Sequence, residues 1–188
     1  MNTRKILSAI LVTGTMLLSG AVFAQKAKTV TVGGAPMYPS KNIIENAVNS
    51  KDHTTLVAAV SATGLVETLK SKGSFTVFAP TNDAFAKLPA GTVETLLKPE
   101  NLKTLQTILT YHVVAGKLNS TDIAKAIKAG NGIATLKTVS GGKITAAMKG
   151  KDLLITDENG NSSKVTIADV NQSNGVIHVV DTVVLPKS

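Results

Sequence analysis

Three histidines are the side chains of this 188-residue chain that titrate nearest neutral pH, and they could bind a metal ion or transfer a proton. They are His53, His112 and His178. None has another histidine or a carboxylate at a ligand spacing such as H-x-x-x-H, so the sequence predicts no metal site. His112 ends a predicted helix, where a ring N–H can bond a free carbonyl, and His178 lies among apolar residues of a predicted strand. We expect both rings to be structural and hydrogen-bonded.

The sequence lacks the short motifs of common catalytic and nucleotide-binding sites. It contains no G-x-S-x-G, no G-x-x-x-x-G-K-[ST] and no G-x-G-x-x-G. It has no cysteine, which excludes disulfides, thiolate metal sites and cysteine nucleophiles. Residues 157–161 (DENGN) resemble a calcium loop in composition, but they lack the spacing and the closing Glu of an EF-hand. The Asn159-Gly160 pair instead predicts a hairpin turn, and we expect neither a reaction nor a cofactor.

The composition restricts the possible partners. Aromatic residues make up only 3% and Trp is absent, so few side chains could stack on bases or sugars. The net charge is +8, yet the lysines are scattered rather than clustered, which argues against nucleic acid. The charge either solvates the surface or attracts the chain to anionic envelope polymers or lipid headgroups.

Residues 1–24 have the pattern of a signal peptide. Arg4 and Lys5 precede a mostly apolar stretch, and Val22-Phe-Ala24 suits a signal peptidase. The alternative is an uncleaved anchor, although the apolar stretch is short for a membrane span. We expect cleavage after Ala24, no transmembrane span in the mature chain, and a periplasmic or extracellular location.

The elements that would position these side chains change in type along the chain. Residues 25–41, rich in Gly and Pro, predict an extended lead-in. Residues 75–79 predict a short strand that Pro80 ends, and Thr81 is placed to cap the following helix. Apolar periodicity predicts helices near residue 42 and over 53–70 (interrupted at Gly64), 82–87, 92–97, 100–111 and 120–129. Strands are predicted over 143–148, 152–156, 164–170 and 176–185, so the fold class is α+β.

Three segments resemble conserved blocks of the fasciclin-like (FAS1) domain family. Residues 75–85 (FTVFAPTNDAF) are similar to its first block, residues 111–112 match its Tyr-His motif, and residues 174–186 (NGVIHVVDTVVLP) are similar to its second block. Their order and spacing also match, and the resemblance covers residues 42–186. A signal-peptide pattern followed by one lone domain resembles the small secreted single-domain bacterial members of this family.

The resemblance implies a FAS1-type wedge or sandwich of β-strands with helices packed around it. It also implies an adhesion module of the cell surface or extracellular matrix that is not an enzyme and needs no cofactor. Its conserved structural positions fall here on Phe78, Pro80, Thr81, Asn82, Phe85, His178, Asp181 and Pro186.

The resemblance further suggests where a partner would bind. Some animal members bind integrins through a short Asp-Ile element and the region around the Tyr-His motif. Here Asp122-Ile123 follows Tyr111-His112 at a similar distance, so we expect a partner-binding region on an exposed rim formed by these four residues. Asp122 also has a structural explanation, because it lies in the first turn of a predicted helix and favours the helix dipole there.

Three functions follow from the sequence. The first is a secreted or periplasmic module that binds a cell-surface or matrix protein or glycan. The second is a periplasmic small-ligand carrier, which would need a roomy apolar pocket that the Val- and Ala-rich core gives no reason to expect. The third is an enzyme of unfamiliar design, which would need a deep cleft holding a carboxylate or histidine with a perturbed pKa.

Overall fold

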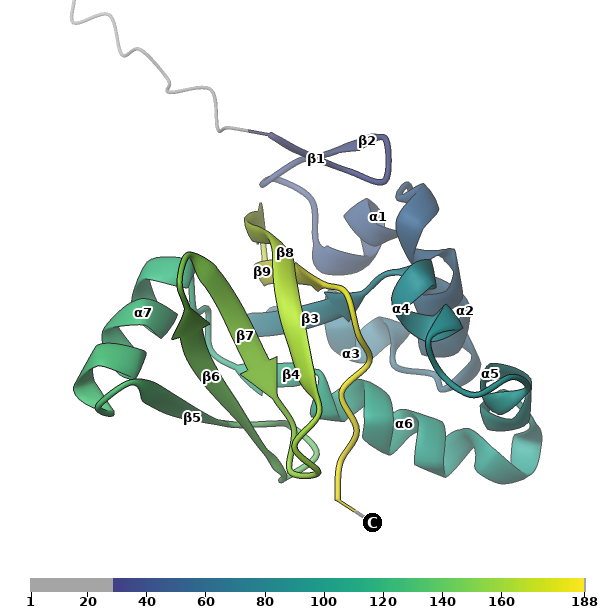
Figure 1. Cartoon of the computed structure of the whole chain (residues 1–188). Coiled ribbons are helices and arrows are strands. Elements are labelled where there is room, and N and C mark those ends of the chain that lie inside the picture. The colour runs from purple at the N-terminus through teal and green to yellow at the C-terminus, as the bar shows by residue number, and fades with distance from the viewer. Residues whose placement is uncertain (1–28, 188) are drawn as a thin grey trace, which may run out of the picture.

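A computed structural model describes residues 29–187 of the chain. The predicted signal peptide, residues 1–24, lies outside this part. Among the described residues, most helices precede Gly130 and most strands follow it, which confirms the α+β class (Figure 1). The helices are α1 (Ile43–Ala47), α2 (Thr54–Ala62), α3 (Val66–Lys70), α4 (Asn82–Ala86), α5 (Thr92–Leu96), α6 (Leu102–Tyr111) and α7 (Ser120–Ala129), with the 3-10 helices η1 (Lys51–His53) and η2 (Pro99–Asn101).

Seven strands form one mixed sheet in the order β4-β3-β9-β8-β7-β6-β5. Neighbouring strands are antiparallel except β3 and β9, which are parallel. The strands are β3 (Phe75–Pro80), β4 (Val113–Ala115), β5 (Ile133–Lys137), β6 (Lys143–Lys149), β7 (Asp152–Thr156), β8 (Ser162–Gln172) and β9 (Gly175–Val180). Helices α1 to α6 gather on one side of this sheet, whereas α7 packs at the other end beside β5 and β6 (Figure 1).

The predicted wedge or sandwich is a single sheet bent at β8. The first residues of β8 pair with β7, and the rest of the strand pairs with β9 through two register irregularities. Asp169 in this strand has φ of 59°, a left-handed conformation that belongs to the distortion. The two ends of the sheet approach each other, because Val114 of β4 forms an isolated bridge with Thr138 just after β5. The strands therefore form the predicted wedge as one bent sheet that curls toward a barrel.

The strand predicted over residues 176–185 is shorter in the structure. Strand β9 ends at Val180, and the Asp181 side chain takes the next hydrogen bond from the Lys164 amide, 2.9 Å away. The chain then leaves the sheet, although Val183 and Val184 stay buried. The apolar residues of this segment are buried as predicted, but the strand is shorter, because a residue can be buried without backbone hydrogen bonds to a neighbouring strand.

The predicted lead-in belongs to the domain core. Strands β1 (Val30–Val32) and β2 (Ala35–Met37) form a hairpin, with Val32 and Met37 both buried. Gly33 and Gly34 make the turn with φ of 56° and 77°. These two side chains of the predicted lead-in pack in a core built mainly by later segments, and we propose that the folded domain begins before residue 42.

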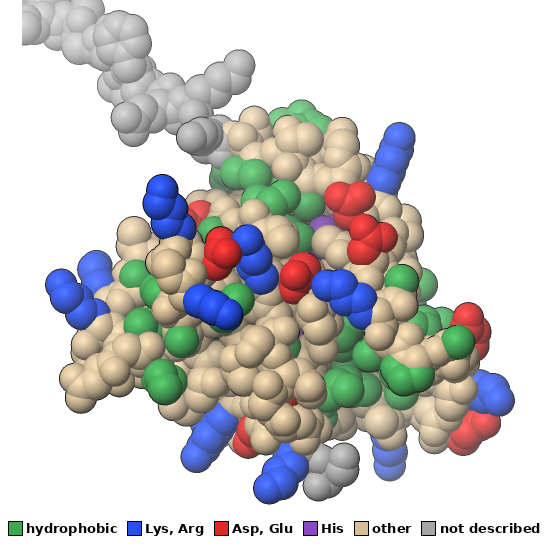
Figure 2. Space-filling model, viewed as in Figure 1, with side chains coloured by type: hydrophobic (Ala, Val, Ile, Leu, Met, Phe, Trp, Pro, Cys, Tyr) green, Lys and Arg blue, Asp and Glu red, His purple; other side chains and the backbone are tan. Residues whose placement is uncertain are grey.

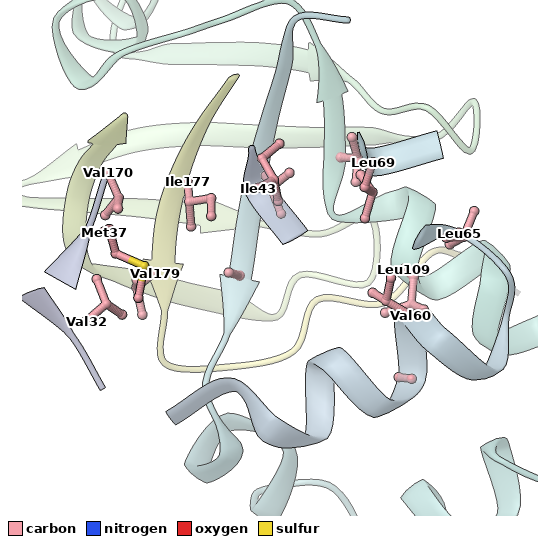
Figure 3. Close-up of a cluster of buried hydrophobic side chains, with 14 of the residues drawn as sticks. Val32, Met37, Ile43, Val60, Leu65, Leu69, Leu109, Val170, Ile177 and Val179 are labelled. Carbon is pink, nitrogen blue, oxygen red and sulfur yellow. The ribbon is translucent and has the colours of Figure 1, made fainter. Parts of the chain in front are cut away.

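Three apolar clusters stabilise the fold. The largest lies between the helices and the β3–β9 part of the sheet, and Figure 3 shows Val32 and Met37 near Val170 and Val179, on the side away from Leu109. The second lies under α7 inside the bent sheet. The third joins α4, α6 and the C-terminal segment. All three depend on aliphatic side chains, as the low aromatic content required.

Candidate functional site

The three family-like segments meet at the centre of the molecule. Strands β3 and β9 lie in parallel register with Phe78 opposite His178, and the Phe78 amide donates to the His112 carbonyl at 2.9 Å. Strands β3 and β9 approach each other so closely at Gly175 that a Cβ on this residue would collide with the Phe75 carbonyl oxygen. Segments separated by up to about a hundred residues therefore form one scaffold.

His112 connects helix α6 to the C-terminal segment. Its ring Nδ1 donates to the Ile108 carbonyl at 2.8 Å, and its Nε2 accepts from the Val184 amide at 3.1 Å. The ring is 3% exposed, and burial lowers its pKa from 6.5 to about 4. The predicted structural role of His112 is confirmed: both ring nitrogens are occupied by backbone groups, and the ring is neutral at pH 7.

His178 has the same kind of environment in the second cluster. Nε2 donates to the Leu118 carbonyl at 2.9 Å, and Nδ1 faces the Asp169 amide at 3.4 Å. The ring stacks on Phe78 with centroids 5.6 Å apart. Burial lowers the pKa of His178, and the prediction of a buried, hydrogen-bonded core histidine is confirmed.

The expectation that Tyr111, His112, Asp122 and Ile123 form an exposed rim is wrong for three of them. Tyr111 and Ile123 are fully buried in the second cluster. The Tyr111 hydroxyl donates to the Lys143 carbonyl at 2.6 Å and accepts from the Glu158 amide at 3.2 Å, and burial raises its pKa. Tyr111 and Ile123 lie on the inner faces of amphipathic helices and therefore pack into the core. A short sequence motif does not show which face of a helix its residues occupy.

Asp122 is the exposed member of this set. Its side chain is 41% exposed, lies 3.8 Å from the Lys125 ammonium, and accepts from the Asn119 amide at 3.2 Å. This bond caps the first turn of α7, so the structural explanation of Asp122 holds. A role in binding a partner is compatible with its exposure, but the fold does not need one.

The remaining motif residues hold elements together. Thr81 accepts from the Ala84 amide at 3.2 Å and caps α4 as predicted. Asn82 caps a different helix: its Oδ1 accepts from the Thr55 amide at 3.0 Å, at the start of α2. Pro80 is the last residue of β3, Phe85 is buried in the third cluster, and the Pro186 carbonyl accepts from the Asn159 side chain at 3.2 Å.

Asp181 connects β9 to its neighbours through its carboxylate. It accepts from the Lys164 amide and from the hydroxyls of Ser163 and Thr182, and it lies 3.6 Å from the Lys87 ammonium. Partial burial acts to raise its pKa, but these hydrogen bonds and the ammonium outweigh it, so the pKa of Asp181 is lowered. Asp181 is a structural residue at the end of the strand.

An apolar cavity lies beside the largest cluster, contrary to the expectation from composition. Its volume is about 320 Å³, within the range of small-molecule sites. Its walls come from the β1–β2 hairpin, helices α1 to α3 and strands β3, β8 and β9, with Leu109 and Val113 at one side. Most of the side chains labelled in Figure 3 belong to its lining. A list of residue types cannot predict it, because a cavity depends on how the elements pack.

His53 and Ser50 are two buried polar residues of this mostly apolar lining. His53 Nδ1 lies 2.9 Å from the Ser50 hydroxyl, while Nε2 has no partner in hydrogen-bonding geometry among the described residues. Burial lowers the pKa of His53, and the nearby Ala79 carbonyl only partly opposes this effect. The pair resembles a nucleophile and base, but both side chains are buried and no carboxylate bonds the free nitrogen, so the arrangement lacks the third group that orients a base.

The described surface offers few other candidates. Figure 2 shows Lys side chains spread around the visible face rather than forming one basic patch. Within residues 29–187, no three His, Cys, Asp or Glu side chains are grouped as a metal site. No helix of the same range is long and apolar enough to cross a membrane.

A family model for the Fasciclin domain matches residues 51–186, which is well over half of the chain. The chain belongs to the Fasciclin domain family. This fasciclin domain is 45% identical over 159 residues to protein sll1483 of Synechocystis, covering 85% of this chain and 81% of that protein. It is 37% identical over 145 residues to immunogenic protein MPB70 of Mycobacterium bovis, covering 74% of this chain and 66% of MPB70. It is also 35% identical over 148 residues to transforming growth factor-beta-induced protein ig-h3 of Sus scrofa, covering 79% of this chain but only 20% of ig-h3.

Proposed function

We propose that this fasciclin domain is exported and acts as an adhesion or interaction module that binds a protein or glycan at the cell surface. The observation that carries this proposal is the family match over residues 51–186, because membership of the Fasciclin domain family implies an adhesion-type module of the cell surface. The signal-peptide pattern of residues 1–24 supports export to the periplasm or beyond. In the described domain the motif histidines and Asp181 are engaged in structural hydrogen bonds.

The contact surface that we propose is the exposed start of α7 around Asp122. Tyr111 and Ile123 would support it from inside, since both belong to the cluster on which α7 packs. The Asp122 carboxylate is accessible and pairs only weakly with Lys125, an exposed ion pair of the kind that contributes little to stability. It is therefore available to a cationic or hydrogen-bonding group of a partner.

The test is saturable binding of the fluorescently labelled protein to isolated cell envelopes and to matrix-coated surfaces. Protease or glycosidase treatment of these surfaces separates a protein partner from a glycan. Asp122→Ala is expected to weaken binding at least fivefold. Asp152→Ala is the matched control, because Asp152 is also exposed and paired with a lysine, Lys164 at 2.9 Å, but lies on β7.

The possible results separate the two parts of the proposal. Absence of saturable binding on every surface would contradict the interaction role. Equal binding by wild type and Asp122→Ala would instead move the contact surface elsewhere on the domain. Recovery of the exported protein with Met1 intact would contradict signal cleavage.

A further inference from the structure

We propose that the apolar cavity beside α2 and α3 is a binding site for an uncharged, mostly hydrocarbon molecule that carries one hydroxyl group. This site is independent of the surface around Asp122, which is not part of the cavity lining. The ligand class follows from the size, lining and charge of the cavity and from one buried histidine.

The size of the cavity fits a small hydrocarbon ligand. Its volume of about 320 Å³ is roughly twice that of an engineered protein cavity that binds benzene. Native interiors contain few voids larger than a water molecule, so a space of this volume next to the main core is unusual packing. A single chain of about ten carbons is a suitable occupant.

The lining selects against water and against charge. An ordered water needs two to four polar partners, and most of the wall surface is apolar, with polar side chains only at scattered positions. Lys70 is the one permanently charged residue among the described lining residues, and its ammonium lies 3.3 Å from the Glu67 carboxylate. An anionic group buried in the apolar part of the lining would lose its hydration there, whereas the Lys70 ammonium, whose side chain is 40% exposed, stays in solvent beside Glu67, so burial of the anion is unfavourable.

Two exposed apolar residues mark where a ligand could enter. Val48, at the end of α1, is 55% exposed, and Val139, just after β5, is 47% exposed. Both belong to the cavity lining, so the lining continues from the buried core to the solvent. An apolar ligand that covers these side chains would remove their surface from water.

His53 supplies the polar contact. It is 4% exposed, it contributes to the lining, and its Nε2 has no hydrogen-bond partner within residues 29–187. The Ala79 carbonyl acts on the ring but makes no hydrogen bond of regular geometry with Nε2, and buried polar groups are normally satisfied, so this nitrogen can take a further partner. A hydroxyl group donates and accepts, and it can therefore bond Nε2 in either tautomer of the neutral ring.

The test uses the fluorescent probe N-phenyl-1-naphthylamine with the purified protein, and decan-1-ol and decanoate at pH 8 as competitors. We expect one probe per chain, displacement by decan-1-ol, and at least tenfold weaker competition by decanoate. Val57→Trp, which enlarges a partly buried lining residue on α2, should weaken probe binding at least tenfold. Ala58→Trp is the matched control, because Ala58 is exposed on the same helix and does not line the cavity.

Two further variants keep the result decisive. Ala47→Phe fills the cavity from α1 and should weaken probe binding as much as Val57→Trp does. If circular dichroism shows that one of these variants folds poorly, the other still tests the site. His53→Leu should weaken competition by decan-1-ol about fivefold while probe affinity stays within twofold. Asp122→Ala should bind the probe like wild type, whatever its effect on surface binding.

Several outcomes would overturn the site. Absence of a stoichiometric fluorescence increase would mean that the cavity closes or is filled by another part of the chain. Equal probe affinity in Val57→Trp and Ala58→Trp would place the probe elsewhere. Competition by decanoate as strong as that by decan-1-ol would overturn the uncharged ligand class, and an unchanged alcohol affinity in His53→Leu would overturn the role of His53.

Discussion

His112 shows how one buried side chain fixes both the fold and its dependence on pH. The neutral ring donates from Nδ1 and accepts at Nε2. Protonation would turn Nε2 into a donor that faces the Val184 amide, another donor, and would place a charge in the core. Both effects disfavour the charged ring, which agrees with its lowered pKa.

The stability of the protein should therefore decrease on acidification. The unfolded chain binds a proton at His112 below about pH 6.5, whereas the folded protein binds it only near pH 4, so acid favours the unfolded state between these values. The unfolding free energy should be constant above about pH 7 and lower by about 2–3 kcal/mol at pH 4.5 from His112 alone. His53 and His178, whose pKa values are also lowered, act in the same direction. Urea unfolding at pH 7.5, 6.0 and 4.5 measures this change.

His112→Asn serves as the control for that series. Asn can still donate to Ile108, but it leaves the Val184 amide without its acceptor, so the variant should be about 1–3 kcal/mol less stable at pH 7.5. Its further loss on acidification should be smaller than in wild type. If the unfolding free energies of wild type and His112→Asn fell by the same amount on acidification, His112 would not be the cause of the acid sensitivity.

Asn174 connects three segments through one buried amide. It accepts from the Ile43 amide at 3.0 Å and donates to the carbonyls of Leu69 and Ser71 at 2.7 and 3.1 Å. Asn174→Ala should lower the unfolding free energy by about 3 kcal/mol, since it leaves buried backbone groups unpaired. Asn49→Ala, which removes one bond from an exposed side chain, should cost under about 0.5 kcal/mol. Chemical denaturation of both variants measures whether loss of the buried amide lowers the unfolding free energy more than loss of the exposed one.

At the scale of elements, the turn after β3 starts two helices at once. Thr81 caps α4, while the next residue, Asn82, caps α2 from a distance of 27 positions in the sequence. The α2 helix has no side-chain cap of its own at His53. One short segment therefore positions the helices that border the cavity and the third cluster.

The Thr81 cap should have a modest and restorable effect. Thr81→Ala is expected to lower the unfolding free energy by about 1 kcal/mol, because the Ala84 amide loses its acceptor. Thr81→Ser keeps the hydroxyl and should recover most of this loss. Thermal and urea unfolding of the two variants test this, and a Ser variant no better than Ala would show that packing, not capping, matters at this position.

At the scale of the whole molecule, the N-terminal hairpin completes the core. Val32 and Met37 are buried against strands that are more than a hundred positions away in the sequence, and the Lys51 amide donates to the Gly33 carbonyl at 3.1 Å. The hairpin also forms one wall of the apolar cavity. Residues 30–37 therefore cover part of the core and do not act as a linker.

A chain that begins at Asn42 should consequently be less stable than one that begins at Thr29. Exposure of the core where Val32 and Met37 pack should cost about 4 kcal/mol, by the usual burial value of such side chains. Met37→Ala in the longer chain should reproduce about half of this loss. Calorimetric melting of the three proteins tests it, and equal melting temperatures would restore the sequence-based boundary at residue 42.

The local patterns predicted most elements because each has a short-range cause. Residues 120–129 form a helix with the predicted bounds, and Thr81 caps the helix that it precedes. Strands β4 and β5 were not predicted as separate elements. Strand β4 has only three residues and comes directly after a helix. Strand β5 alternates in burial, but its outward residue Ile133 is apolar and 55% exposed, so its residue types do not show the period of two.

The sequence by itself determined the family and the α+β class, and it predicted hydrogen-bonded rings for His112 and His178, although it also placed His112 on an exposed rim. These depend on residue types and on their order along the chain, which the motifs preserve. Only the tertiary structure decided that Tyr111 and Ile123 face the core, that the hairpin completes that core, and that an apolar cavity with an unpaired His53 nitrogen lies beside it. The physical reason is that exposure and empty volume arise from the packing of distant segments, and no local pattern records which neighbours a side chain will meet.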